Sequence, residues 1–143
     1  MRVVFDSNVI VSALVSSTGP SAQLIALVQS GTSDLLISEE IVAEYRRVIT
    51  YPKVVQRLAE NIHEAQALIE QLWSIGLRIR PANGIRVVEA DSTDDKFIAC
   101  ALSGKARYIV SSDNHLLELR SYQGIHILKP CELLNLLTGQ SSR

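Results

Sequence analysis

Short apolar runs alternate along the chain with segments whose apolar residues recur at helical spacing. The apolar runs predict five strands, at residues 2–5, 35–38, 77–80, 108–110 and 125–128. The amphipathic segments predict helices at residues 6–15, 21–30, 39–50, 53–58, 61–75, 93–103, 113–119 and 130–137. Strands that alternate with helices are typical of a parallel sheet covered on both faces. The pattern therefore predicts an α/β fold, a three-layer α/β/α sandwich around a mainly parallel, five-stranded sheet.

Residues that begin or end helices support these boundaries. Either Asp6 or Ser7 can cap the first helix, because both side chains accept hydrogen bonds from backbone N–H groups. Gly31 suits the position after the second helix, and Pro52 ends the third. Residues 85–88 are either an alternative to the third strand or a continuation of it.

A chain of 143 residues has room for one ordinary domain and none for a second hydrophobic core. We expect this domain to span residues 1–138, followed by a short tail at residues 139–143. With 47% hydrophobic and 20% charged residues, the composition excludes a disordered or fibrous chain. Because aromatic residues make up only 5%, the core has to be built mainly from aliphatic side chains.

Cysteine usage and hydropathy bear on the compartment. Cys100 and Cys131 are too few for a disulfide framework, so each is expected to be a small buried apolar residue in a reducing compartment. Asp6 and Asn8 interrupt the first apolar stretch, which excludes a good signal peptide. No segment reaches the roughly 18 apolar residues that a membrane span needs. We therefore expect a cytoplasmic protein without membrane association.

The charge balance leaves the type of substrate open. The net charge is −1, from 14 basic and 15 acidic residues, with no basic tail or dense basic patch. If four of the acids bind metal, 14 basic residues face 11 remaining acids. Charge alone therefore neither supports nor excludes a nucleic-acid substrate.

The positions of four acids point to a site. Asp6 follows the first strand and Asp113 follows the fourth, so both belong at the carboxyl edge of the sheet, where open α/β folds bind ligands. Glu44 lies at the rim of the apolar face of its helix, and Asp95 lies in the first turn of another helix, also at the flank of an apolar face. Clustered carboxylate oxygens suit Mg²⁺ or Mn²⁺ and can serve metal-assisted phosphodiester hydrolysis.

Each acid also has an ordinary structural interpretation. Asp6 can be a helix cap, and Asp95 and Asp113 can complement a helix dipole. Glu44 can be a solvated helix residue. From the residues alone, both interpretations of each acid stay open.

Three motifs resemble those of PIN-domain nucleases. Asp6-Ser7-Asn8, which ends the first strand, resembles their opening Asp-[Ser/Thr]-Asn motif. Residues 95–101, Asp-Lys-Phe-Ile-Ala-Cys-Ala, resemble the helix that carries their third acid, and residues 108–117, Tyr-Ile-Val-Ser-Ser-Asp-Asn-His-Leu-Leu, resemble their strand-four motif. The order and spacing are similar over nearly the whole chain, through the closing segment 125–136.

The resemblance implies roles for individual residues. The implied metal ligands and catalytic residues are Asp6, Glu44, Asp95 and Asp113, with Asp94 as the rival of Asp95 for the third position. Asn8 is expected to orient the first carboxylate, and Ser111 to lie just behind the ligands. His115 stands where many PIN domains carry another acid, and it is either a proton donor near the scissile phosphate or an exposed helix residue. Arg46 and Arg47 either contact RNA phosphates or lie on a solvated helix face.

The subgroup that this chain resembles is the toxin component of bacterial toxin–antitoxin pairs. That resemblance implies cleavage of single-stranded RNA with Mg²⁺ or Mn²⁺, inhibition by a small antitoxin protein, and a homodimer. One alternative is a catalytically inactive PIN fold that serves as a protein-interaction module. Another is a metal-dependent phosphatase or receiver-like domain, for which Lys129 after the last strand is suggestive, although no Asp follows the third strand directly.

Overall fold

The central sheet has six strands in the order β3-β2-β1-β4-β6-β5. The computed structural model describes residues 1–81 and 95–139. The strands are β1 (Arg2–Phe5), β2 (Asp34–Ile37), β3 (Leu77–Arg78), β4 (Tyr108–Val110), β5 (Ser121–Tyr122) and β6 (Ile125–Leu128). All neighbouring pairs are parallel except β5 and β6, which are antiparallel. The expected mainly parallel sheet is therefore confirmed.

The sixth strand, β5, corrects the expected number of five. β5 and β6 form a hairpin joined by Gln123 and Gly124, whose φ angles of 46° and 83° are both positive. Two consecutive positive φ angles are typical of the tight type I′ turn that joins antiparallel strands. A strand of two residues is too short to show a period-two pattern, which is why the sequence did not reveal it.

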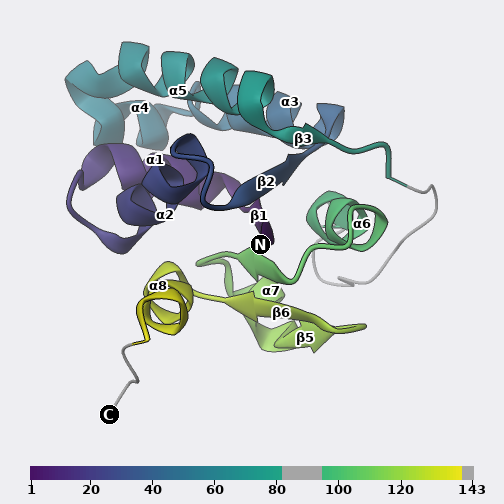
Figure 1. Ribbon diagram of the computed structural model, residues 1–143. Helices are drawn as coiled ribbons and strands as arrows, with labels where there is room; N and C mark the ends of the chain where they lie inside the picture. Colours follow the sequence, from purple (N-terminus) through teal and green to yellow (C-terminus); the bar gives the residue numbers. More distant parts are fainter. Residues whose placement is uncertain (82–94, 140–143) are drawn as a thin grey trace.

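The predicted helices are all present, with small shifts at their ends. They are α1 (Ser7–Val15), α2 (Pro20–Gln29), α3 (Glu39–Val48), α4 (Pro52–Leu58), α5 (Ile62–Ile75), α6 (Asp95–Ser103), α7 (Asn114–Leu119) and α8 (Pro130–Thr138), with a 3-10 turn, η1 (Ala59–Asn61), between α4 and α5. Figure 1 shows most of the strands between α1, α2 and α8 on the left and α6 on the right. This is the layered α/β arrangement that the alternating pattern predicts. The alternative strand at residues 85–88 and the first residues of the helix predicted at 93–103 lie outside the described residues.

The core is aliphatic and continuous. The side chains of Val3, Val4 and Phe5 in β1 are at most 1% exposed, because this strand lies inside the sheet. Strands buried on both faces have continuous apolar sequences, which explains why the runs were recognisable. Cys100 is fully buried, as expected, but Cys131 is exposed on the first turn of α8, so the expectation of a buried Cys131 was wrong.

Within the described ranges, no single helix is both long and apolar enough to cross a membrane. The consecutive helices α1 and α2 pass a test of length and composition only as a pair, and they are bent by 106° at the break between them.

The order of the strands determines where a site can form. From β1 the chain proceeds outward to β2 and β3, and it then returns to the other side of β1 to add β4 and β6. Ligands of open α/β sheets bind at such a reversal, beyond the carboxyl ends of the strands. The carboxyl ends of β1 and β4 are therefore the expected position of a site.

Candidate functional site

Polar residues continue the sheet by one row beyond β1, β4 and β6. Phe5 is in register with Val110, and Val110 with Leu128. The backbone N–H of Asp6 donates to the carbonyl of Val110 at 2.9 Å, and that of Ser111 donates to the carbonyl of Leu128 at 3.0 Å. Asp6, Ser111 and Lys129 thus follow one another across the carboxyl edge, at the reversal of strand order.

Asp6 is a buried carboxylate at the centre of this row, and its side chain is 6% exposed. Its Oδ1 accepts the backbone N–H of Asn8 at 3.2 Å, and its Oδ2 accepts the Ser111 hydroxyl at 2.6 Å. Burial raises the pKa of Asp6 above its ordinary value, and the negative charges of Glu44 and Asp113 add to that rise. The two hydrogen bonds oppose the shift in pKa without cancelling it.

Asp6 also caps α1, through the same hydrogen bond from Asn8. The interpretation of Asp6 as a helix cap is therefore confirmed. The contact from Asn8 comes from its backbone N–H, while the Asn8 side chain is exposed.

Ser111 connects two of the acids. Its side chain is fully buried, its hydroxyl donates to Asp6, and the same oxygen accepts the backbone N–H of Asp113 at 2.8 Å. Ser111 therefore holds the Asp6 carboxylate and the start of the loop that carries Asp113 in a fixed relation.

Glu44 reaches the same region from α3. Its Oε2 accepts the hydroxyl of Ser7, the neighbour of Asp6, and its Oε1 lies 2.7 Å from the Nζ of Lys96 on α6. The Glu44 side chain is only 15% exposed. The interpretation of Glu44 as a solvated helix residue is therefore wrong.

Asp113 lies at the more open side of the cluster, with a side chain 31% exposed. It caps α7, since its Oδ1 accepts the backbone N–H of His115 at 2.7 Å and that of Leu116 at 3.4 Å. The Nδ1 of His115 lies 3.8 Å from the same oxygen, and the imidazole is 48% exposed. His115 is therefore an exposed residue beside an acid of the cluster.

Asp95 is 7% exposed in the first turn of α6, a helix that packs against β1, β2 and β4. Its rival Asp94 lies outside the described residues. Within residues 1–81 and 95–139, no three His, Cys, Asp or Glu side chains are gathered as a ready metal site. Hydrogen bonds already engage both oxygens of Glu44, and carboxylates repel one another when no cation lies between them.

The available donors nevertheless fit a hard divalent cation. The carboxylates of Asp6, Glu44 and Asp113 and the hydroxyls of Ser7 and Ser111 offer oxygen atoms, which suit Mg²⁺ or Mn²⁺ better than zinc. A carboxylate of Asp or Glu has about four lone-pair positions, so those of Asp6 and Asp113 keep capacity after the hydrogen bonds described above.

Arg46 and Arg47 differ in their surroundings. The guanidinium of Arg46 makes two hydrogen bonds to Glu70 on α5, of 2.9 and 2.7 Å. Both partners are about half exposed, and their contact raises the pKa of Arg46 and lowers that of Glu70. Arg47 is exposed on α3, and the described part of the chain supplies it with no ion pair.

Sequence reasoning missed three residues that build the cluster. Ser7 and Lys96 hold Glu44, and the buried hydroxyl of Tyr45 donates to the carbonyl of Phe5 at 2.5 Å. Burial raises the pKa of Tyr45 well above its ordinary value, so its phenol stays a donor. A signal existed for Lys96, a charged residue between Asp95 and the buried Phe97.

A mainly parallel α/β sheet with acids at its strand reversal defines a recognisable class of domain, and comparison with known proteins identifies it. Residues 2–115 match the family model described as the PIN domain. This match covers well over half of the chain, and the protein belongs to the PIN-domain family. Membership indicates a function of the nuclease type, in a family that typically uses divalent metals.

A relative is found in Methanocaldococcus jannaschii. The chain is 28% identical to an uncharacterized protein of that organism over 120 residues, which cover 84% of this chain and 76% of the relative. No solved structure gives a significant match.

Proposed function

We propose that the protein is a divalent-metal-dependent endoribonuclease that hydrolyses phosphodiester bonds of single-stranded RNA. The observation that carries this proposal is the buried carboxylate of Asp6, which lies at the strand reversal under the negative charges of Glu44 and Asp113. A buried charge needs a partner of opposite charge, and a cation between these acids supplies one. Asp6, Glu44, Asp95 and Asp113 are the proposed metal ligands and catalytic residues.

The residues around the acids have defined tasks in this proposal. When bound, Mg²⁺ or Mn²⁺ supplies Lewis-acid polarisation of the phosphate and lowers the pKa of a water molecule. Ser111 and the Asn8 N–H hold the Asp6 carboxylate in one orientation, while Ser7 fixes one oxygen of Glu44. The exposed imidazole of His115 is suited to give a proton to the leaving oxygen.

Arg46 and Arg47 on α3 are the proposed contacts with RNA phosphates. Arg47 is the more available of the two, because Arg46 has to leave its ion pair with Glu70 first. The contribution of an exposed pair is small, typically below about 1 kcal/mol, so the exchange is feasible. Single-stranded RNA is favoured because a flexible backbone enters a site at a sheet edge more readily than a duplex does.

Beyond the chemistry, we propose that the protein is the toxin of a toxin–antitoxin pair. In that role it acts in the cytoplasm as a homodimer and is inhibited by a small antitoxin protein. The proposal rests on the resemblance of the motifs at residues 6–8, 95–101 and 108–117 to those of toxin components. A neighbouring gene for a small DNA-binding protein, whose product co-purifies with this chain and stops RNA cleavage, is the expected finding.

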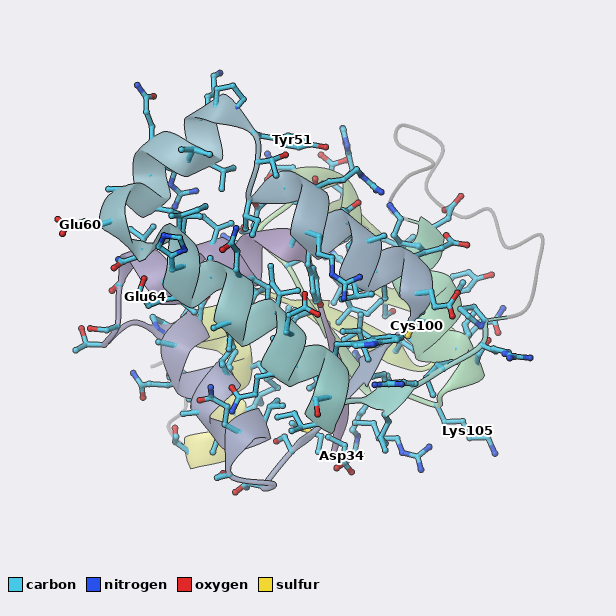
Figure 2. All side chains as sticks on the ribbon, turned by 90° about the horizontal axis from the view of Figure 1, so that it is seen from above. Asp34, Tyr51, Glu60, Glu64, Cys100 and Lys105 are labelled. Atoms are coloured by element: carbon cyan, nitrogen blue, oxygen red, sulfur yellow. The ribbon has the colours of Figure 1, made fainter. Side chains whose placement is uncertain are left out.

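Replacement of Glu44 is the sharpest test of the enzymatic proposal. Purified protein should cleave single-stranded RNA with Mn²⁺ and stop when EDTA is added. Glu44→Gln should reduce the rate by at least 100-fold while circular dichroism shows a folded chain, because the amide is a poor metal ligand. Glu64→Gln, an exposed residue on α5, is the matched control and should keep the full rate (Figure 2). A Glu44→Gln protein with wild-type activity would refute the proposed ligand set.

One observation favours a second candidate, a catalytically inactive interaction module. The ion pair between Lys96 and Glu44 already compensates one acid of the cluster without a metal. Titration with Mn²⁺ distinguishes the two functions, because only the nuclease has to bind the metal ion. A phosphatase or receiver-like domain has less support: Lys129 lies in the polar row, but Ile79 and Arg80, not an acid, follow β3.

A further inference from the structure

Lys96 brings a positive charge into the acidic cluster from within the chain. It is the second residue of α6, next to Asp95, and its Nζ lies 2.7 Å from Oε1 of Glu44, a residue 52 positions away. The side chains of Lys96 and Glu44 are 11% and 15% exposed. By contrast, the surface pair of Arg46 and Glu70 is 48% and 56% exposed. The Lys96 pair is therefore shielded from solvent and salt, and its electrostatic effect is correspondingly stronger.

Glu44 connects the positive charge of Lys96 to Asp6. Glu44 is held on one oxygen by Lys96 and on the other by Ser7, which directly follows Asp6 in the chain. The charge of Glu44 is felt at Asp6, where it raises the pKa. Lys96, Glu44 and Asp6 thus form one electrostatic group. Glu44 lies between the ammonium of Lys96 and the buried carboxylate of Asp6 in this group.

We propose that Lys96 takes the place of a second divalent cation, so that the acidic site binds a single Mg²⁺ or Mn²⁺. This inference rests on the proposed function, because it assumes that the acids bind metal. Two-metal sites hold their ions about 3.5–4 Å apart and need carboxylates that reach both ions. The ammonium already lies within contact distance of Glu44 and repels a second cation there. The single ion then binds between Asp6 and the remaining lone pairs of Glu44, and Lys96 is a positioning residue for Glu44.

Lysine is suited to this task. An ammonium has three donors and no acceptor, so it can hold a carboxylate oxygen without competing for the metal as a ligand. Methionine at the same position has a similar length and shape but no charge. Lys96→Met therefore removes the cation with little loss of volume, and Lys96→Arg keeps it.

Counting bound Mn²⁺ by electron paramagnetic resonance tests the inference without reference to activity. Metal-free wild-type protein should bind one Mn²⁺ per chain at saturation. The bound amount is measured as the decrease in the six-line signal of free Mn²⁺. Lys96→Met should bind two, because the Oε1 of Glu44 that Lys96 holds in the wild type becomes available to a second ion, and Lys96→Arg should bind one. Lys53→Met, which removes an exposed lysine from α4, is the matched control and should also bind one.

The outcomes separate this inference from the function on which it rests. Two Mn²⁺ ions in the wild-type chain, or one in a folded Lys96→Met protein, would overturn the role of Lys96 and leave the nuclease proposal standing. No Mn²⁺ bound by the wild-type chain would overturn the metal site itself and the inference with it. If Lys96→Met does not fold, Lys96→Gln, which also removes the charge, takes its place and should bind two Mn²⁺ ions; one ion in that folded variant would likewise overturn the role of Lys96.

Discussion

The hydroxyl of Ser111 donates a 2.6 Å hydrogen bond to the carboxylate of Asp6, across 105 residues of sequence. The same oxygen accepts the backbone N–H of Asp113, so one buried side chain links two of the proposed ligands. This small arrangement orients the carboxylate on which the proposed chemistry depends. Replacement of Ser111 therefore tests this arrangement directly.

Ser111→Ala should destabilise the protein. The change removes the hydroxyl from the buried Asp6 carboxylate and leaves the partly buried N–H of Asp113 without its acceptor, which together cost about 1–3 kcal/mol. Urea unfolding in metal-free buffer measures the loss. Ser112→Ala, one residue further on and exposed, should change the free energy of unfolding by less than about 0.5 kcal/mol. Equal losses in the two variants would contradict the role given to Ser111.

Asp6→Asn should be neutral or stabilising in metal-free buffer. Burial, with the charges of Glu44 and Asp113, raises the pKa of Asp6 in the folded state above 3.8, so ionised Asp6 costs stability. Between the unfolded and folded pKa values the folded state binds more protons, and the stability of the wild type falls as pH rises through that window. The advantage of Asp6→Asn should therefore be greatest above the folded-state pKa of Asp6 and fade as pH falls toward 3.8.

The helix cap provides the control for that experiment. Asparagine keeps an oxygen that can accept the N–H of Asn8, whereas alanine does not, and a lost cap costs about 1 kcal/mol. Asp6→Ala should accordingly be less stable than Asp6→Asn at every pH. Clear destabilisation by Asp6→Asn at neutral pH would mean that the cap and not the crowded acidic site dominates the energetics of this residue.

Mg²⁺ or Mn²⁺ should raise the melting temperature, since an ion that binds only the folded state stabilises it by mass action. At 100 times the dissociation constant the gain is about 2.7 kcal/mol. Asp6→Asn combined with Asp95→Asn should abolish the shift, as measured by differential scanning fluorimetry. Asp34→Asn, exposed at the start of β2 and labelled in Figure 2, should keep it. A shift that persists in the double variant would locate the metal elsewhere.

The two cysteines should differ sharply in reactivity. Burial raises the pKa of the Cys100 thiol to about 12, and this residue, labelled in Figure 2, is fully buried. Cys131 is exposed. At pH 8 a disulfide reagent such as DTNB should therefore titrate one thiol per native chain and a second only after unfolding. Native Cys131→Ser protein should not react, and rapid reaction of that variant would show that Cys100 is accessible.

Much of the fold was predictable because its signals are local. The buried strands, such as β1, show as apolar runs, and α3 shows as helical spacing. Ser38 and Gly31 lie at helix ends for reasons of backbone chemistry, with Ser38 accepting the N–H of Ile41 and Gly31 at φ +81°. The hairpin of β5 was not predictable, since its two residues carry no period and its turn residue Gln123 has an uncommon positive φ.

The candidate site was likewise predictable only where its signals are local in the sequence. The sequence by itself determined that Asp6 and Asp113 come after strands β1 and β4, because a carboxylate shortly after an apolar run is visible in the sequence. Only the tertiary structure decided that Ser111 holds Asp6 and that Lys96 and Ser7 hold Glu44. These contacts join residues 105, 52 and 37 positions apart. The first depends on the pairing of β4 with β1, and the other two depend on how α3 and α6 pack beside β1. No local pattern of apolar and polar residues specifies either.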